Sequence, residues 1–231
     1  MSIAALRHLE QEVPECARCP RLGAYLRELR RRHPDYWNKP VPGFGDRRAW
    51  LAIVGLAPGL HGANRSGRPF WLDASGEWLY GELEHQGFWN GARLTGAYLL
   101  NAVKCVPPQN RPTGAEQTSC NAWLEQELAA LSSLRVVIAL GTIAHTAVLR
   151  SWDVRPRNRY PFSHRSVHRI DGHPPLLSSY HPSRQNTNTG VLTRPMWRDI
   201  FRRANRLATK PHPRPAGPRP TTQAPRQRRA Q

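Results

Sequence analysis

The sequence predicts an α/β protein: a three-layer α/β/α sandwich with a central four-stranded parallel sheet. Short, uniformly apolar runs are typical of strands buried on both faces, and helix-like segments lie between these runs. The 231 residues suffice for one such domain with a buried core. Right-handed crossovers place the carboxyl ends of parallel strands at one edge, where open α/β sheets bind their ligands.

Four short apolar runs are the predicted strands, because hydrophobic residues fill them without the alternation of a one-sided sheet. They cover residues 50–55, 98–103, 135–140 and 176–180. One short helix is expected before the first cysteine. Further helix-like segments cover residues 75–86, 117–131, 142–149 and 194–207.

The domain organisation follows from the change in composition near the C-terminus. Residues 1–207 are predicted to fold, and residues 208–231 are predicted to be a disordered basic tail rich in Pro and Arg. From Arg202 onward the chain has nine Lys or Arg, which supply half of the net charge of +18, and it has no Asp or Glu. Such a segment cannot bury enough apolar surface to offset its ordering entropy.

The net charge and the hydropathy favour a nucleic-acid partner and argue against a membrane or secreted protein. A net charge of +18 favours a polyanionic partner, so nucleic acid is expected; a basic surface kept for solubility is the alternative for the tail. No membrane association is expected, because no apolar run approaches the ~20 residues of a membrane span. The N-terminus lacks the apolar stretch of a signal peptide, which indicates a cytoplasmic protein and disfavours disulfides.

The four cysteines lie at two distant places, as Cys16 with Cys19, then Cys105 and Cys120. A shared site would tie the N-terminus to the loop after the second strand. A zinc site usually shows two tight Cys-x-x-Cys pairs, whereas 14 residues separate Cys105 from Cys120. An iron–sulfur cluster tolerates loose spacing. The pattern therefore favours a cluster over zinc, and zinc over disulfides, without excluding any of them.

Long polar loops leave the strands at the ligand-binding edge. The loop at residues 55–76 is rich in glycine but has neither the Walker A nor the dinucleotide-binding spacing, so no nucleotide cofactor is expected. Its Phe70 and Trp71 are apolar residues within a polar loop. One of them is expected to pack against the sheet, and the other to stack on a planar ligand such as a base.

Three polar residues near this edge are candidates for the chemistry. Asp73 is either the N-cap of the following helix or a carboxylate that orients water. Asn101 lies in an apolar strand, and its buried amide needs partners that a base edge could supply. A lone histidine is more often structural, but the position of His181 at the same edge favours a catalytic role.

Taken together, these segments resemble the iron–sulfur uracil-DNA glycosylases of family 5, over residues 16–197. The matching stretches are residues 55–59, 61–68, 101–105 with Pro107 and Pro108, and 181–190, together with the four cysteines. The similar family 4 enzymes carry an acidic residue at the position of Leu56. This difference points to family 5.

The resemblance implies a monofunctional glycosylase that flips uracil out of DNA and hydrolyses its N-glycosidic bond, which initiates base excision repair. It also implies activity on other deaminated bases such as hypoxanthine, a structural 4Fe–4S cluster on Cys16, Cys19, Cys105 and Cys120, and a monomer acting on DNA. The implied site residues are Asp73 and His181 for catalysis; Gly55, Ala57, Gly59, Phe70 and Asn101 for the base; and Ser183, Arg184, Gln185 and Asn186 for the DNA minor groove.

Other functions stay open at this point. A uracil-specific enzyme of the family 4 type is the nearest alternative, and a non-catalytic nucleic-acid-binding module stabilised by a metal is a second. A hydrolase of a small phosphorylated substrate is disfavoured, because no cluster of metal-binding carboxylates accompanies the glycine-rich loop.

Overall fold

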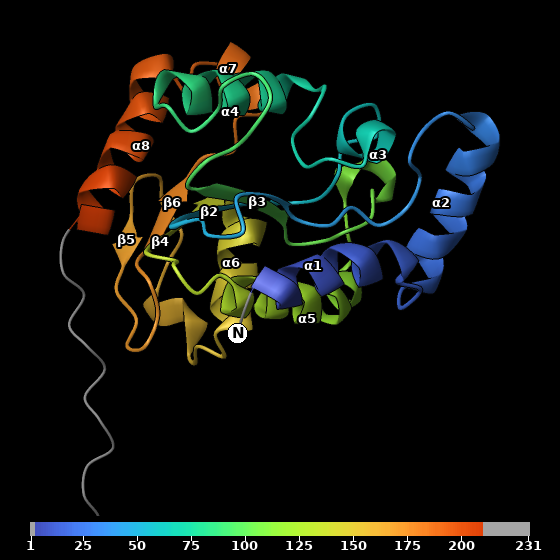
Figure 1. Ribbon diagram of the computed structural model, residues 1–231, viewed down its shortest axis with the longest axis horizontal. Coiled ribbons are helices and arrows are strands. Elements are labelled where there is room, and N and C mark those ends of the chain that lie inside the picture. Colours follow the sequence, from blue (N-terminus) through green and yellow to red (C-terminus); the bar gives the residue numbers. More distant parts are fainter. Residues whose placement is uncertain (1–2, 210–231) are drawn as a thin grey trace, which may run out of the picture.

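A central sheet covered by helices on both faces forms the body of the molecule (Figure 1). The computed structural model describes residues 3–209. Four inner strands of the sheet are parallel, as the sequence predicts. They are β2 (Leu51–Gly55), β3 (Ala97–Asn101), β4 (Val136–Leu140) and β6 (Leu176–Ser179).

The sheet is wider than the prediction. Its order is β1-β3-β2-β4-β6-β5, and the two edge strands pair antiparallel to their neighbours. These edges are β1 (Phe44–Gly45) and β5 (Val167–His168). Each has only two residues, which is too short for a periodic pattern to appear in the sequence.

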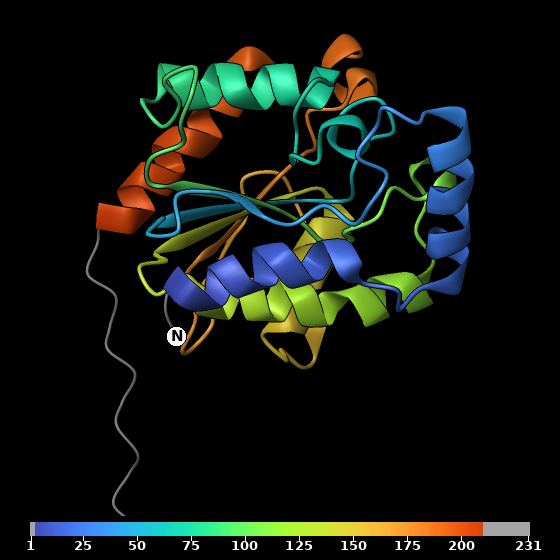
Figure 2. The same cartoon turned by 45° about the vertical axis from the view of Figure 1, so that its right-hand side comes forward.

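Two hydrophobic cores, one on each face of the sheet, confirm the three-layer sandwich (Figure 2). Helices α1 (Ile3–Glu12), α5 (Gly114–Ala130) and α6 (Thr142–Ser151) cover one face, and α4 (Ala74–His85) and α8 (Arg194–Thr209) cover the other. Leu51 and Ile53 of β2 pack toward α4 and α8, whereas Ala52 and Val54 pack toward the opposite helices. Every residue of the inner strands is buried, which explains why those runs are largely apolar, with Asn101, Ser178 and Ser179 as the buried polar residues.

The boundaries of two elements differ from the prediction for local reasons. Strand β3 ends at Asn101, because the next two N–H groups donate to the carbonyls of Gly55 and Leu56 and the chain turns there. Helix α5 begins at Gly114, because Thr113 and Glu116 form a capping box. Cys120 therefore lies in the second turn of α5.

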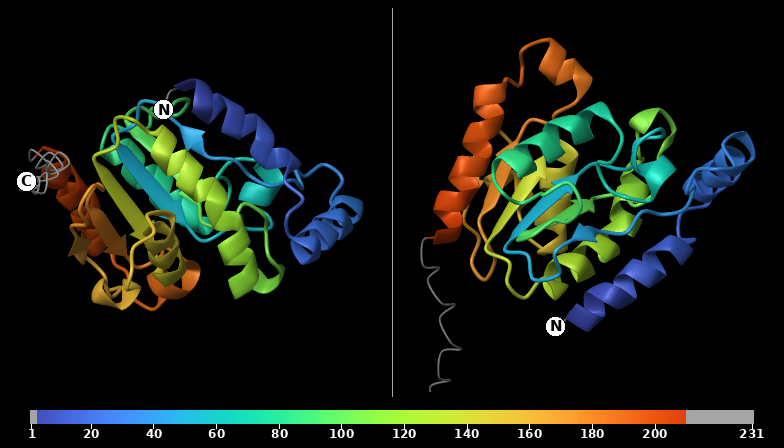
Figure 3. Two further views of the ribbon diagram at one scale, coloured as in Figure 1. Left: turned by 90° about the horizontal axis from the view of Figure 1, so that it is seen from below. Right: turned by 45° about the horizontal axis from the view of Figure 1, so that its top comes forward.

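The remaining helices are short or stand at the periphery. Helix α2 (Pro20–Arg32) projects at one end of the molecule, beside α3 (Ala63–Ser66) (Figure 3). The others are α7 (Arg184–Asn188) and the 3₁₀ helices η1 (Val13–Glu15), η2 (Pro108–Asn110) and η3 (Arg157–Arg159).

Helix α8 runs to Thr209, two residues beyond the predicted end of the domain. The rest of the predicted tail lies outside the described residues. Between residues 3 and 209, no helix has both the length and the apolar character to cross a membrane.

Candidate active site

The carboxyl ends of the inner strands open into a cavity of about 340 Å³, a size typical of small-molecule sites. Residues from four separate loops and strand ends meet there. The lining residues are Leu56, Ala57, Gly59, Ala63, Phe70, Asp73, Ser75, Asn101, Asn110, His181 and Ser183. The structure thus brings together most of the residues that the sequence singled out at this edge.

Phe70 and Trp71, the two apolar residues of the polar loop, have different surroundings in the structure. Phe70 lines the cavity, with its ring centroid 6.4 Å from that of His181. Trp71 packs away from the cavity. Its ring centroid lies 4.9 Å from that of Tyr80, and the guanidinium carbon of Arg68 lies 3.9 Å from the centroid of its ring. Trp71 therefore anchors the loop, and Phe70 is the ring that a planar ligand can meet.

The backbone of this loop is bent to present the ring. Phe70 and Leu72 both have positive φ angles, +56° and +68°, which side-chain-bearing residues rarely adopt. Such backbone strain persists where the surrounding structure fixes it, and it clusters at functional sites. The stacking of Arg68 over Trp71 supplies that fixation next to Phe70.

Asn101 stands at the end of β3 with an unsatisfied donor. Its side chain is 3% exposed, and within residues 3–209 its amide Nδ2 has no hydrogen-bond partner. A buried donor without a partner costs about 1–3 kcal/mol, so its retention calls for a ligand acceptor. Gly55 pairs with Asn101 in the sheet and makes room for the amide: a β-carbon at position 55 would lie 2.9 Å from Asn101 Oδ1.

Asp73 has one of the two roles that the sequence offered, the N-cap of α4, and its carboxylate also lines the cavity. One carboxylate oxygen caps α4 by accepting the N–H of Gly76 at 2.7 Å. The other oxygen lies over the backbone of Gly59 and Gly62; a β-carbon at position 59 would stand 3.0 Å from it. Burial raises the pKa of Asp73 above its ordinary value, while backbone N–H donors and the charge of Arg184 act in the opposite direction.

His181 follows β6 and lines the cavity opposite the glycine-rich loop. Dense packing around its imidazole lowers the pKa to about 4, because burial penalises the charged form. The ring is therefore neutral at neutral pH, and one of its nitrogens carries a proton that it can donate.

The four predicted DNA-binding residues lie on α7 and its cap. Ser183 is the N-cap of α7 and also lines the cavity, and the side chains of Arg184 and Gln185 are exposed. The amide of Asn186 turns inward instead and donates to the carbonyl of His181 at 2.9 Å. Helix α7 is thus fastened directly to the chain segment that carries His181.

An open groove of about 510 Å³ adjoins the cavity and shares Gly59, Asp73, Ser75, Asn110 and Ser183 with it. Sequence reasoning assigned no role to Asn110 or Ala63. The only signal for Asn110 is its place after two prolines, and the structure shows a positive φ of +56° there. Ala63 belongs to α3, which was too short to be predicted.

The four cysteines, far apart in sequence, line one small cavity between the start of α2, the loop after β3 and α5. All four are free thiols. Two N–H groups point at their sulfurs: the indole Nε1 of Trp123 lies 3.2 Å from Cys16 Sγ, and the backbone N of Lys104 lies 3.1 Å from Cys120 Sγ. Such donors typically orient and stabilise thiolate ligands of a metal group.

The arrangement differs from a single-ion site. In residues 3–209, no group of three or more His, Cys, Asp or Glu is placed to hold one metal ion. The four sulfurs nevertheless surround a common space. Burial raises the pKa of Cys105 and of Cys120, and the proximity of the other cysteines raises it further. The donor set, four thiols with N–H groups directed at two of them, fits a group held by cysteines alone.

The fold and the site define the class of this protein, which is an α/β enzyme. One cavity brings together the Phe70 ring, the Asn101 amide, which has no partner among residues 3–209, the buried carboxylate of Asp73 and the neutral imidazole of His181. Residues 42–205 match the Uracil DNA glycosylase superfamily. A type-5 uracil-DNA glycosylase of Thermus thermophilus is 45% identical over 86% of this chain and 96% of its own length, and one of Mycobacterium leprae is 40% identical over 88% and 96%.

A type-4 uracil-DNA glycosylase of Archaeoglobus fulgidus is more distant, with 28% identity over 85% of this chain and 88% of its own length. The chain therefore belongs to the uracil-DNA glycosylase superfamily, in its type 5 family. This confirms the resemblance seen in the sequence and the preference for family 5 over family 4.

Proposed function

We propose that this protein removes uracil from DNA by hydrolysing the N-glycosidic bond, which leaves an abasic site and initiates base excision repair. The observation that carries the proposal is the unpartnered amide of Asn101 beside the Phe70 ring in a cavity that also holds Asp73 and His181. The relatives of type 5 support the same activity. Because its substrate is DNA, the protein would act inside the cell, in the cytoplasm of a prokaryote.

The substrate must leave the duplex before it can react. A stacked base is out of reach of a cavity at the end of a sheet, so the nucleotide flips out at a cost of a few kcal/mol. Phe70 then stacks on the base, and Asn101 Nδ2 donates to a carbonyl of its edge. The ring supplies affinity for any base, whereas the amide selects among base edges.

Bond cleavage develops opposite charges on the two fragments. As the bond between C1′ and the base nitrogen breaks, its electron pair passes to the base, and cationic charge builds on the sugar. The carboxylate of Asp73 stabilises that cation and accepts a proton from the water whose oxygen bonds to C1′. His181 donates a hydrogen bond to the departing base, where a neutral donor is suited to developing negative charge.

Helix α7 takes the DNA-facing role in this proposal. Arg184 and Gln185 are exposed at its first turn, next to the cavity entrance that Ser183 lines. They would enter the minor groove and occupy the space left by the flipped nucleotide. Asn186 helps to position His181, because its side-chain amide donates a hydrogen bond to the backbone carbonyl of that residue. One molecule carries all of these elements, so a monomer suffices.

The range of bases is a separate part of the proposal. Position 56 is Leu, and Asp73 is the one acidic side chain that lines the cavity among residues 3–209. No carboxylate at position 56 restricts which base edge can enter the cavity, which supports activity on hypoxanthine as well as uracil.

We also infer that the four cysteines hold a 4Fe–4S cluster. Support comes from four free thiols around one space and from the two N–H groups directed at their sulfurs. When bound, the group would be structural: it would tie the start of α2 to the loop after β3 and to α5. Iron and acid-labile sulfide in equal amounts are expected, and stoichiometric zinc instead would contradict this assignment.

Alkali-induced strand scission tests the glycosylase proposal directly. A duplex with one uracil is incubated with the purified protein and then heated in alkali, which breaks the strand at an abasic site. Cleavage at the uracil position, and no cleavage without alkali, is expected for a monofunctional glycosylase. A second duplex with hypoxanthine tests the wider base range. No cleavage of either duplex by protein with its full iron content would overturn the proposal.

A further inference from the structure

A group of exposed and half-buried aromatic and basic side chains lies outside the cavity, where α2 meets α3. His33 and Tyr36 stack with ring centroids 4.7 Å apart, and the Tyr36 hydroxyl shares a hydrogen bond with His61 Nδ1 at 3.0 Å. The guanidinium of Arg65 lies 5.5 Å from the Tyr36 ring, and Trp37 is 40% exposed. These five residues are called the α2–α3 platform below.

The platform is held rigidly from beneath. Asn38 and Asn64 are fully buried and joined by a hydrogen bond of 2.9 Å between their side chains. Asn38 also donates to the carbonyl of His33 at 2.7 Å, and the backbone N of Trp37 donates to Arg65 O at 3.0 Å. Buried polar pairs of this kind lock the two segments together, so the exposed rings are preorganised.

The platform continues the groove that leads to the base cavity. His61 lines that groove, and so do Asp73 at the cavity entrance and Arg184 of α7. A strand lying in the groove with its flipped nucleotide in the cavity would meet α7 on one side. On the other side it would meet the platform.

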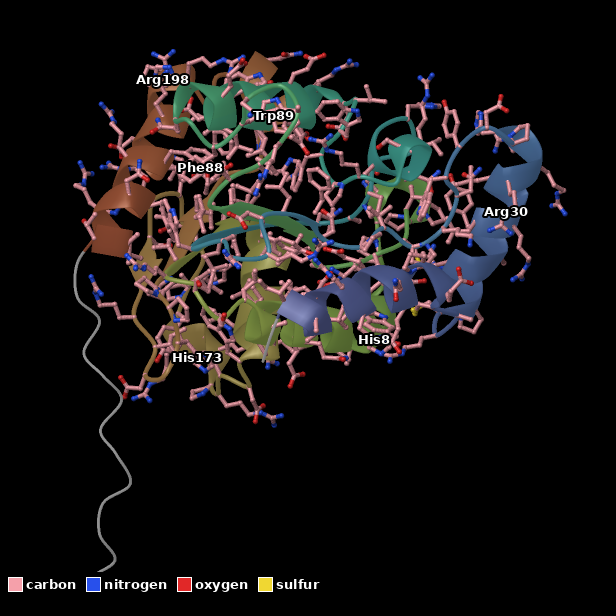
Figure 4. All side chains as sticks on the ribbon, viewed as in Figure 1. His8, Arg30, Phe88, Trp89, His173 and Arg198 are labelled. Atoms are coloured by element: carbon pink, nitrogen blue, oxygen red, sulfur yellow. The ribbon has the colours of Figure 1, made fainter. Side chains whose placement is uncertain are left out.

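The charge beside the platform suits the phosphate backbone. Helix α2 projects at this end of the molecule and carries exposed arginines, among them Arg30, which is labelled in Figure 4. Arg27 and Arg31 are exposed on the same helix, and Glu28 is its acidic residue, paired with Arg32 at 3.1 Å. Basic side chains next to exposed aromatic rings are the usual means by which proteins hold a nucleic-acid strand.

We propose that the α2–α3 platform is a second DNA-contact surface, which receives the strand on the side of the flipped nucleotide away from α7. Arg65 pairs with a phosphate there, and the Tyr36 ring packs against the adjacent sugar or base. The proposal rests on the proposed function, because it takes DNA as the ligand of the groove. It assigns a contact role to residues that the cavity chemistry does not use.

Binding to DNA of decreasing length tests this surface. The probes are fluorescent duplexes with one stable abasic analogue, shortened stepwise from either end, and the readout is anisotropy. Tyr36→Ala and Arg65→Ala are each expected to weaken binding of the longest duplex about tenfold, and Arg65→Ala to reduce the salt slope by about 1. The loss should vanish once shortening from one particular end removes the platform-contacting segment.

Two control variants separate the platform from general charge and from folding. Arg169→Ala removes one exposed charge next to β5, at the other edge of the sheet, and should bind every probe as the wild type does. Tyr36→Phe keeps the ring and should retain most of the affinity. Binding of the shortest duplex by all variants shows that they are folded.

Two results would overturn the proposal. One is that Tyr36→Ala and Arg65→Ala both bind DNA with the affinity and the salt slope of the wild type. The other is that each variant loses as much affinity for the short duplexes as for the long ones. Excision of uracil by the wild-type protein is measured separately. A wild type that excises uracil while the variants bind normally would refute the platform alone, and a wild type that excises nothing would refute the proposed function.

Discussion

The Phe70 ring packs directly against the backbone of Gly55, so closely that a β-carbon at position 55 would collide with it. Gly55 ends β2 and pairs with Asn101, the last residue of β3. The register of β2 and β3 therefore fixes the position of the Asn101 amide and of the Gly55 backbone against which the Phe70 ring packs. The positions of the Phe70 ring and the Asn101 amide depend on this glycine because no other residue leaves the required space.

Gly55→Ala is expected to reduce uracil excision at least tenfold and to cost about 1–3 kcal/mol of stability, because the ring and the amide must both move. Gly81→Ala is the matched control. Gly81 lies on the exposed side of α4, and a β-carbon there would meet no atom of the described chain within 4 Å, so alanine should stabilise the helix by about 0.5–1 kcal/mol. Single-turnover excision and urea unfolding measure the two effects; equal activity of both variants would contradict the packing argument.

Asp73→Asn separates the carboxylate from the helix cap. The amide oxygen of asparagine can still accept the Gly76 N–H, so α4 keeps its N-cap. Burial raises the pKa of Asp73, so the folded protein binds a proton at this residue more readily than the unfolded chain, and loss of the charge should not lower stability at neutral pH. Excision should fall by about 10²–10⁴-fold.

The same shift predicts the acid side of the pH profile. Because the raised pKa belongs to a group that must be ionised, excision should decline with falling pH earlier than it would for an exposed aspartate. Single-turnover rates across pH check this. A wild-type rate that stays constant down to pH values near the ordinary aspartate pKa would remove Asp73 as the ionised base.

His181→Ala is expected to slow excision by about 10²–10³-fold, the effect of losing one preorganised donor. The imidazole has a pKa of about 4 in the folded protein, against about 6.5 when unfolded, so it stays neutral across neutral pH. As pH falls from 6.5 toward 4, protons bind the unfolded chain preferentially and stability is lost. His181→Ala should lose less stability across that window, and an NMR titration of His181 near 6.5 would contradict the neutral-donor role.

Asn101→Leu exchanges the unpartnered amide for an apolar side chain of similar shape. Removing a buried donor that lacks a partner within the described residues should leave stability unchanged or raise it by about 1 kcal/mol, while excision of uracil falls sharply. Thermal unfolding and single-turnover kinetics are measured on the same preparation. A variant that is both less stable and fully active would show that Asn101 supports the strand and does not bind the base.

Cys120→Ser tests the structural role of the cysteine site. Cys120 lies in α5 and shares its cavity with Cys16 and Cys19 at the start of α2, so losing one ligand should release α2 from the sheet layers. A lower unfolding temperature, lower iron content and faster proteolysis near residues 13–32 are expected. Wild-type stability in an iron-free variant would contradict the proposed clamp.

The fold and most cavity residues were predictable from the sequence because their signals are local. Uniformly apolar runs marked β2, β3, β4 and β6 within one or two residues, and parallel strands bring their carboxyl ends to one edge. That rule alone placed Asp73, Asn101 and His181 near one another. The edge strands, α3 and α7 escaped prediction because a few residues leave no period to detect, and the 13-residue α2 was not predicted either.

The sequence by itself determined most of the side chains that line the cavity; the tertiary structure added Ala63 and Asn110 and decided how each side chain is packed. It placed Phe70 in the cavity and Trp71 beneath Arg68, made Asp73 both the cap of α4 and part of the cavity lining, and turned Asn186 inward to His181. These choices depend on positive φ angles and on contacts between segments far apart in the chain. No periodicity in the sequence records such contacts, because they arise only when separate loops pack together.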